Sequence, residues 1–297
     1  MVENLRLEIV GLGGGNIFLG NGAAEVIFTI AQALKPVKAL IPAPTFAEYE
    51  IALRSVDTNI EYYMMNEDAD FQIGEDILEY LDRDVDIFFL CNPNNPTGAI
   101  TDKRRIKAII ARCKELNITV VLDECFLDFA DNKDELTLFD ELATNEHLII
   151  LKAFTKLYAM AGVRLGYCLC ADHRLIERME DMVQPWNVST LAQEAGIAAL
   201  RQGEYVKNSL EFIGEEKIWL KESLEKLGLK VWNSQGNYLF FKGSENLGES
   251  LKKMNIIVRD CSNYVGLEKG YYRTAIKLHH ENERLIYAID YILKIER

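Results

Sequence analysis

Three groups of polar residues in this chain directly follow apolar, strand-like segments, and their side-chain types suit the binding of one small molecule. The run from Asn92 to Gly98 follows an apolar segment that ends at Cys91, Asp123 follows the segment VVL, and Lys156 comes a few residues after the segment LIIL. Open α/β sheets bind their ligands at the carboxyl ends of the strands. Each group alone has an ordinary explanation in turn chemistry, helix capping or a solvated surface. Their joint occurrence predicts a ligand site that offers an amine, a carboxylate and an amide.

Helix and strand patterns alternate along the first 185 residues, which is the arrangement needed to bring these groups together. Apolar periodicity predicts helices in 23–35, 48–53, 74–81 and 102–116, and strands in 38–41, 59–64, 86–91, 119–122, 147–151 and 165–170. Such alternation predicts a mostly parallel sheet that is covered by helices on both faces. Because parallel strands end at the same edge, the polar groups are expected to meet there.

The pattern changes from about residue 186. Two helices are predicted in 190–202 and 205–227, short strands in 230–232, 238–242, 256–259 and 271–276, and a closing helix in 281–295. We therefore expect a large α/β domain in residues 1–185 and a smaller α+β domain in residues 186–297.

Composition narrows the classes of partner. The net charge of −13 and the pI of about 4.9 disfavour nucleic acids and anionic membranes, which require a basic face. No segment approaches the roughly 18–20 apolar residues of a membrane span, and the N-terminus lacks a secretory pattern. The six cysteines are scattered without further metal ligands nearby, which predicts free thiols in a reducing cytoplasm and no metal site.

The motifs and their order resemble those of the fold-type-I pyridoxal-phosphate enzymes, in the class I and II aminotransferase group. The matching stretches run through nearly the whole chain: Gly22–Glu25, Pro44–Phe46, Asn92–Gly98, Asp123–Glu124, Thr155–Lys156, Arg164–Gly166 and Arg273. The resemblance implies a mostly parallel seven-stranded sheet between helices with a smaller α+β C-terminal domain. It also implies pyridoxal 5′-phosphate as the cofactor and a homodimer with its site at the subunit interface.

The resemblance assigns the reacting part of the cofactor to three residues. Lys156 forms the Schiff base with the cofactor aldehyde and later moves a proton at the substrate's Cα. Asp123 keeps the pyridine nitrogen protonated, and Asn95 donates a hydrogen bond to the ring hydroxyl. Many relatives carry a tyrosine where this chain has Phe126, so that second donor to the ring hydroxyl is missing.

Anion-binding roles follow from the same resemblance. The backbone N–H groups of Ala23 and Ala24 open a predicted helix and suit the cofactor phosphate, together with the Thr155 hydroxyl and the Arg164 guanidinium. Phe46 stands where relatives stack an aromatic ring on the cofactor. Another matching position, in the segment GYYRTAI, is Arg273, which is expected to bind the α-carboxylate of the substrate.

Within this group the chain is most similar to the branch of histidinol-phosphate aminotransferases and threonine-phosphate decarboxylases. The segment VRDCSNYVGLEKGYYRTAI, together with the phenylalanine in DECFLDF, favours the decarboxylases of the cobalamin pathway. Decarboxylation of a small phosphorylated amino compound is therefore the expected reaction. Amino transfer between histidinol phosphate and 2-oxoglutarate or glutamate stays open as the alternative.

Two further functional hypotheses depend on the N-terminal part of the chain. Relatives carry a longer segment before the GNGA element, with a substrate lid and a tyrosine for the neighbouring cofactor phosphate, whereas residues 1–19 precede that element here. A catalytically silent relative is thus a second alternative. A nicotinamide dehydrogenase is disfavoured, because the glycine-rich run Gly11–Gly15 has Asn16 at the third glycine position and lacks a preceding strand.

Overall fold

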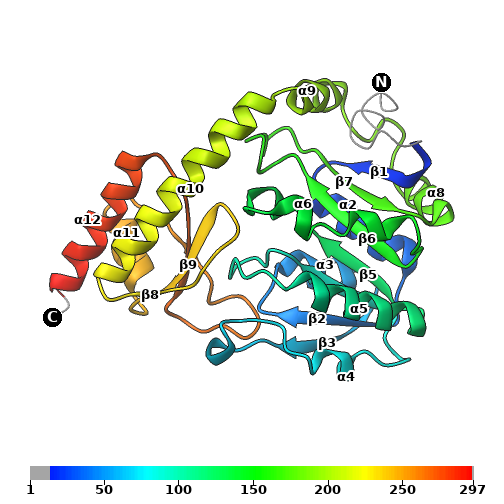
Figure 1. Ribbon diagram of the computed structural model, residues 1–297, viewed down its shortest axis with the longest axis horizontal. Helices are drawn as coiled ribbons and strands as arrows, with labels where there is room; N and C mark the ends of the chain where they lie inside the picture. The colour runs from blue at the N-terminus through cyan, green and yellow to red at the C-terminus, as the bar shows by residue number, and fades with distance from the viewer. Residues whose placement is uncertain (1–13, 296–297) are drawn as a thin grey trace.

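Two β-sheets organise the chain, a large one at the right of Figure 1 and a small one at the left. The computed structural model describes residues 14–295. Residues 1–13, which include the first part of the glycine-rich run, lie outside the described residues. The chain has an α/β fold, as the alternating pattern predicts.

The large sheet has seven strands in the order β1-β7-β6-β5-β4-β2-β3. Its strands are β1 Ile17–Gly20, β2 Lys38–Ala43, β3 Asn59–Met64, β4 Ile87–Cys91, β5 Thr119–Asp123, β6 Leu148–Ala153 and β7 Gly166–Cys170. Strands β2 to β6 are parallel to one another. Strand β7 is antiparallel to both β6 and β1. This confirms the mostly parallel seven-stranded sheet. Strand β1 was not predicted, because four residues are too few for a periodic signal and pairing with β7 decides their conformation.

Helices cover both faces of this sheet. They are α2 Ala23–Leu34, α3 Ala47–Arg54, α4 Ile77–Tyr80, α5 Lys103–Leu116, α6 Lys133–Leu136, α7 Phe139–Leu142 and α8 His173–Met182, with short 3₁₀ turns η1 Gly14–Asn16, η2 Glu67–Ala69 and η3 Leu127–Phe129. The prediction of a helix over 74–81 was too long, since α4 forms a single turn. Helix α8 was missed, although Asp172 caps it and Leu175, Ile176 and Met179 give it a buried stripe.

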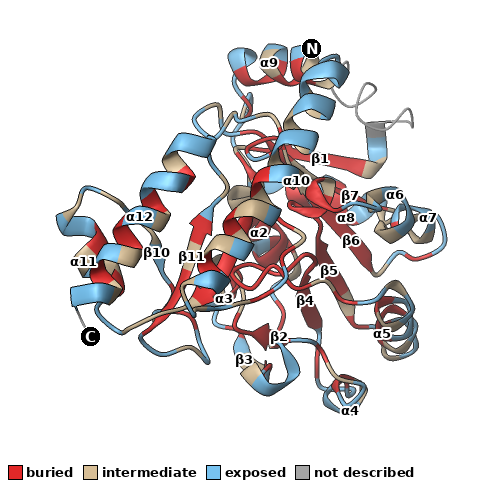
Figure 2. Cartoon of the chain, turned by 60° about the vertical axis from the view of Figure 1, so that its left-hand side comes forward, coloured by how far each residue is buried: buried red, intermediate tan, exposed pale blue. Residues whose placement is uncertain are grey.

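Side chains of the central strands alternate between two apolar clusters. Phe88 and Leu90 of β4 point to the cluster that contains α5, whereas Ile87, Phe89 and Cys91 point to the cluster that contains α2, α3 and α8. All five residues of β4 are buried, and Figure 2 shows the central strands as a buried layer between more exposed helices. Both faces of the sheet are therefore covered, and the strand ends are left as the place for a ligand.

The small sheet has four antiparallel strands in the order β10-β11-β9-β8. Its strands are β8 Lys230–Val231, β9 Tyr238–Lys242, β10 Arg259–Asp260 and β11 Tyr271–Ala275, and its helices are α10 Gly203–Lys226, α11 Leu247–Lys253 and α12 His279–Ile295. Helix α9 Thr190–Leu200 packs instead against β1 and β7 of the large sheet, through Ala192 and Ala199. The prediction of a strand over 256–259 was wrong for 256–258. The N–H of Ile256, which follows α11, instead donates to the carbonyl of Leu251 within that helix, and Ile257 is 85% exposed.

One face of the small sheet joins the core of the large sheet. Helices α10, α11 and α12 cover the other face, around Leu239, Phe241 and Tyr272. On the inner face, the ring of Phe71 lies edge-on to Trp232, Phe240 and Tyr271, at centroid distances of 5.4, 5.6 and 6.1 Å. These contacts hold strand β11 beside the carboxyl ends of the large-sheet strands.

A cluster of charges closes the same junction. The Glu67 carboxylate accepts hydrogen bonds from Lys242 Nζ at 2.8 Å and Lys230 Nζ at 3.0 Å, and from the Tyr271 hydroxyl. Hydrogen bonds from Lys242 and Tyr271 lower the pKa of Glu67 to about 2.

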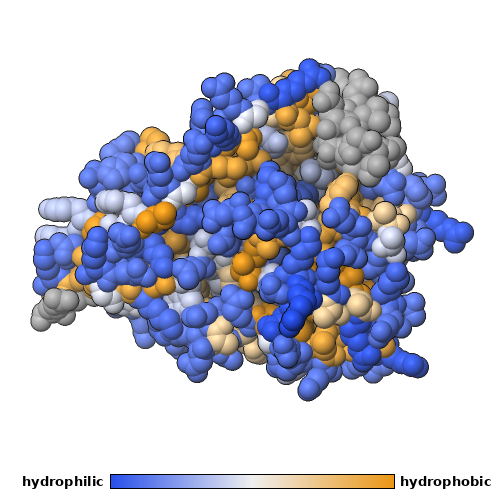
Figure 3. Space-filling model, viewed as in Figure 1, coloured by the Kyte–Doolittle hydropathy of each residue, from blue (hydrophilic) through white to orange (hydrophobic). Residues whose placement is uncertain are grey.

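Hydrophilic residues predominate on the face of the molecule seen in Figure 3, with apolar patches between them. Within residues 14–295, no helix is long and apolar enough to cross a membrane.

Candidate active site

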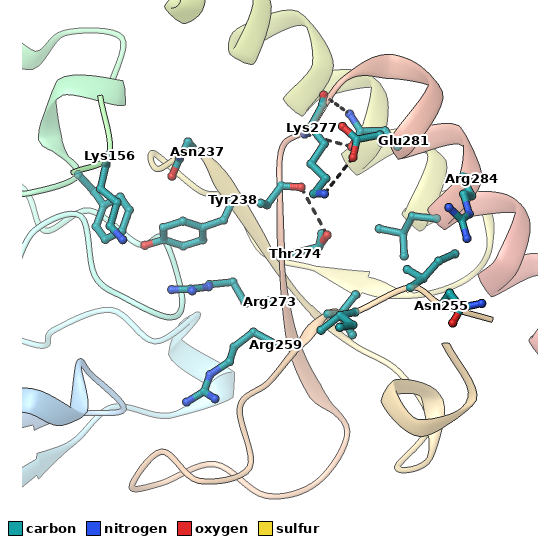
Figure 4. Close-up of a pocket in the computed structure, with 17 residues that line it drawn as sticks. Lys156, Asn237, Tyr238, Asn255, Arg259, Arg273, Thr274, Lys277, Glu281 and Arg284 are labelled. Carbon is teal, nitrogen blue, oxygen red and sulfur yellow. Dashed lines mark hydrogen bonds and ion pairs between the residues drawn. The ribbon is translucent and has the colours of Figure 1, made fainter. Parts of the chain in front are cut away.

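Lys156 lies in the turn that follows β6 and faces a cavity of about 410 Å³. In Figure 4 its side chain points towards Tyr238 and Arg273 of the small sheet. The ammonium nitrogen lies 5.7 Å from the centre of the Phe126 ring. Although Lys156 is exposed to the open cavity, crowding around the nitrogen removes part of its hydration, and this desolvation lowers the pKa of Lys156. The positive charges of Arg273 and Arg164 lower this pKa further, so the amine is more readily neutral.

Asp123 ends β5, in register with Cys91 of β4 and Leu151 of β6. Its carboxylate is buried and accepts hydrogen bonds from the Cys125 N–H at 2.9 Å and from the Tyr49 hydroxyl at 2.5 Å. Burial raises the pKa of Asp123, while those two donors oppose the rise. A buried carboxylate that is bonded to neutral donors suits a cationic ring nitrogen as its further partner.

The loop from Asn92 to Gly98 is fixed by its own side chains at the end of β4. Asn94 Nδ2 donates to the Pro44 carbonyl at 3.0 Å and to Thr97 Oγ1 at 2.9 Å. Gly98 has a φ of 74°, and a side chain there would collide with Ser234. This loop holds the buried Asn95, whose side-chain oxygen accepts a hydrogen bond from Arg273 Nη1. Asn95 and Arg273 therefore meet across the two sheets.

The start of α2 forms a tight cradle beside β7. A Cβ atom on Gly166 would lie 2.4 Å from the Ala23 nitrogen, and one on Gly22 would lie 2.6 Å from Arg164 Nη2. Gly22, with a φ of 85°, precedes the helix and gives it no side-chain cap. The first N–H groups of a helix have no partner within it, so those of Ala23 and Ala24 suit an anion. The predicted residues Ala23, Ala24 and Arg164 are therefore gathered in one place.

Two further predicted residues, Thr155 and Phe46, come from two other segments. Thr155 is buried in the turn after β6, next to Lys156. Phe46 is half-buried at the start of α3, and its ring lies edge-on to Tyr49 at a centroid distance of 5.6 Å.

Three residues of the site were not assigned to it by sequence reasoning: Arg259, Tyr238 and Tyr49. Arg259 of β10 lies directly opposite Arg273 of β11, and Figure 4 shows both guanidinium groups on the Lys156 side of the small sheet. The Tyr238 hydroxyl donates to the Asn94 carbonyl at 2.6 Å, and the Arg273 guanidinium lies 4.9 Å from the Tyr238 ring centre. The pairing of two short strands places Arg259, which stands in the segment VRDCSNYVGLEKGYYRTAI without having been assigned a role there.

The fold and this gathering of groups define a class of protein. A lysine after β6, a buried carboxylate at the end of β5 and a glycine-lined helix start beside β7 fit the amine-reactive aldehyde, ring nitrogen and phosphate of pyridoxal phosphate. The chain is a pyridoxal-phosphate-dependent enzyme of fold type I. It belongs to the family described as aminotransferase class I and II, whose profile matches residues 12–292.

Named relatives fall into two activities. The chain is 38% identical to threonine-phosphate decarboxylase of Salmonella typhimurium, over 93% of this chain and 77% of the relative. It is 30% identical to histidinol-phosphate aminotransferase of Methanothermobacter thermautotrophicus, over 94% of this chain and 75% of the relative.

Solved structures of both activities share the fold. Histidinol-phosphate aminotransferase of Clostridium acetobutylicum superposes with a TM-score of 0.90 at 28% identity, covering 99% of this chain and 87% of that one. The L-threonine-O-3-phosphate decarboxylase of Porphyromonas gingivalis gives a TM-score of 0.86 at 25% identity, covering 98% of this chain and 89% of that one.

Proposed function

We propose that this enzyme decarboxylates a small phosphorylated amino acid such as threonine phosphate, with Lys156 as its catalytic lysine. The observation that carries the proposal is the pair formed by Arg259 and Arg273, which lie directly opposite each other and face the cavity of Lys156. Like charges at directly opposite positions of two strands destabilise a sheet. A substrate with two anionic groups, a carboxylate and a phosphate, offsets that repulsion.

The two arginines offer different environments to the two anions. The guanidinium of Arg273 is half-buried, bonded to Asn95 and placed over Tyr238, so its orientation is fixed. Arg259 is exposed; its guanidinium donates to Asn263 Oδ1 at 3.1 Å and lies 5.6 Å from the centre of the Tyr264 ring. We assign the α-carboxylate to Arg273 and the phosphate to Arg259, because a fixed planar guanidinium orients a carboxylate best.

The predicted cofactor residues keep their roles in this proposal. The start of α2, Thr155 and Arg164 bind the cofactor phosphate, Asp123 binds the ring nitrogen, and Asn95 binds the ring hydroxyl. Phe46 covers the ring. Glycine at position 166 supports the phosphate role, because a side chain there would fill the space above the Ala23 nitrogen.

When bound, pyridoxal phosphate accepts the electron pair that is released when a bond to the substrate's Cα breaks. Lys156 supplies the amine for covalent attachment, and desolvation together with two neighbouring arginines lowers its pKa, which favours the neutral form that reacts. After carbon dioxide has left, Lys156 Nζ donates a proton to Cα, which takes the place of the lost carboxylate. Phe126 places an apolar ring rather than a hydroxyl beside this nitrogen, which limits the access of water.

We propose that the enzyme works as a homodimer, that it acts in the cytoplasm, and that residues 1–185 and 186–297 form its two domains. Its family is generally homodimeric. The six cysteines are free and buried, which suits a reducing compartment. The division at 185 separates the strands of the two sheets.

Amino transfer from histidinol phosphate to 2-oxoglutarate is the second candidate. The fold of the Clostridium acetobutylicum histidinol-phosphate aminotransferase, with its TM-score of 0.90, favours it. Histidinol phosphate carries a phosphate but no carboxylate, so it would use one of the two arginines at a time.

The deciding experiment incubates the cofactor-loaded chain with threonine phosphate or with histidinol phosphate and 2-oxoglutarate. Release of carbon dioxide and formation of 1-amino-2-propanol phosphate are expected from the first substrate. Formation of glutamate from the second without carbon dioxide release from the first would overturn the proposal. A visible cofactor band in the wild type but not in Lys156→Ala is expected beforehand, and its absence from both would identify a silent relative.

A further inference from the structure

Tyr49 places its hydroxyl against Asp123 in the interior of the large sheet. The phenol is fully buried and donates to Asp123 Oδ2 at 2.5 Å, while the other carboxylate oxygen accepts from the Cys125 N–H at 2.9 Å. Both oxygens are thus held by donors from different elements, the hydroxyl from α3 and the N–H from the turn after β5. This pair of bonds fixes the plane of the carboxylate.

The Tyr49 ring is itself held in place. It stacks on Phe89 of β4 at a centroid distance of 4.9 Å and an interplanar angle of 23°. Its other contact is edge-on, with Phe46 at 5.6 Å and 82°. A buried ring with contacts on two sides loses its rotational freedom, so the hydroxyl has one position.

We propose that Tyr49 is a positioning residue for the cofactor ring. Its hydroxyl aims the Asp123 carboxylate at the ring nitrogen, and its ring braces Phe46, which covers the ring face. One side chain thereby sets two cofactor contacts that come from separate loops. The inference rests on the proposed roles of Asp123 and Phe46 and adds a residue that acts through both.

The hydroxyl also affects which partner holds the shared proton. A hydrogen bond to a carboxylate favours its ionised form and weakens it as a base. With Tyr49 in place, Asp123 leaves the proton on the ring nitrogen. Without the hydroxyl, the buried carboxylate is a stronger base and draws that proton towards itself, and one of its lone pairs is unpaired.

The test compares Tyr49→Phe with a matched control, Tyr63→Phe. Tyr63 also donates its hydroxyl to an aspartate, Asp76 Oδ1 at 2.7 Å, but it lies in the core cluster on the other face of the sheet. Both substitutions remove one hydroxyl and keep the ring. The readouts are the dissociation constant of pyridoxal phosphate from the apoenzyme and the ¹⁵N NMR signal of cofactor labelled at the ring nitrogen.

For Tyr49→Phe we expect cofactor affinity to fall about tenfold and the ¹⁵N signal to move towards the unprotonated position. Tyr63→Phe is expected to leave both at the wild-type values. An unchanged affinity and ¹⁵N signal in Tyr49→Phe would overturn the proposal, because a merely structural hydroxyl changes only the thermal stability of the apoenzyme.

A second variant separates an effect through Asp123 from a general loss of packing around Tyr49. In the Asp123→Asn background the buried charge is gone, so Tyr49→Phe should leave cofactor affinity as it is in Asp123→Asn alone. A further loss in the double variant would show that Tyr49 acts apart from Asp123 and would overturn the proposal. Failure of the proposed function looks different, because then the wild type releases no carbon dioxide from threonine phosphate, whatever Tyr49→Phe does to cofactor affinity and the ¹⁵N signal.

Discussion

The two sides of the site are built in different ways. The large-sheet side consists of Lys156, Asp123 and Asn95, which lie at the ends of parallel strands or in the loops after them, and of the start of α2, which follows the antiparallel edge strand β1. The small-sheet side consists of Arg259, Arg273 and Tyr238, which lie on or beside short antiparallel strands. On the large-sheet side, local sequence determines position. On the small-sheet side, cross-strand register does.

This difference separates two tasks. The large-sheet side carries groups for the parts that every pyridoxal-phosphate enzyme shares, namely the aldehyde, the ring nitrogen and the phosphate. Under the proposed function, the small-sheet side faces the substrate and carries the charges that select it. Damage to the first side should therefore affect the cofactor, and damage to the second should affect substrate binding.

The largest effect is expected from Lys156→Ala on the large-sheet side. Without the amine no covalent attachment forms, so activity should fall by several orders of magnitude. Mass spectrometry after borohydride reduction should find cofactor-linked protein in the wild type and none in the variant. Lys207→Ala, whose side chain is 74% exposed on α10, is the matched control and should keep the linked mass. A cofactor-linked mass that persists in Lys156→Ala would contradict the assignment.

Arg259→Ala and Arg273→Ala test the small-sheet side. Each should raise the KM for threonine phosphate by about tenfold to a hundredfold and change the dissociation constant of the cofactor much less. Steady-state kinetics give the KM and cofactor titration gives the dissociation constant. Arg112→Ala, at a partly exposed residue of α5, is the control. Equal losses in substrate and cofactor binding for Arg273→Ala would mean that Arg273 is structural.

The same Arg273 variant has a consequence for pH. Arg273 is one of the positive charges that lower the pKa of Lys156, so its removal should raise that pKa. Because capture of the cofactor requires the neutral amine, the acidic limit of the capture rate should move to higher pH in Arg273→Ala. Stopped-flow absorbance across a pH series measures this limit.

Gly166→Ala should damage the phosphate cradle on the large-sheet side. Its Cβ would lie 2.4 Å from the Ala23 nitrogen, so β7 and α2 must move apart, at a cost of about 1–3 kcal/mol in stability. Cofactor affinity should fall with it. Gly214→Ala on α10 is the control. A Cβ atom at this position meets no atom within 4 Å, so the substitution should stabilise the chain by about 0.5–1 kcal/mol. Calorimetry of both apoproteins would decide, and equal melting temperatures would refute the steric argument.

The smallest effect is expected from Glu67→Gln at the junction between the two sides. The pKa of Glu67 is lowered to about 2 in the folded chain, from 4.5. Its contribution is therefore present above pH 4.5 and is lost as the pH falls towards 2. At neutral pH the variant should be less stable by about 1 kcal/mol, and the difference should vanish in acid. Denaturant unfolding at neutral pH and in acid measures this difference in stability. A difference that grows in acid would contradict the prediction.

The sequence by itself determined most of the large-sheet side. Apolar strand segments are local patterns, and polar residues directly after them must lie at the sheet edge where parallel strands end. The spacing around Asp123 and Lys156 therefore placed these residues correctly at the ends of β5 and β6. The chain also contained the signal for α8, in the cap Asp172 and the stripe behind it.

Only the tertiary structure decided the rest. Strands β1 and β10 have four and two residues, so pairing with distant segments and not their own sequence makes them strands. Arg259 meets Arg273, and Tyr49 meets Asp123 across 74 positions of chain, through register and core packing. Such contacts join residues that share no local pattern, and the free energy that fixes them comes from burial in the assembled core, which no short stretch of sequence contains.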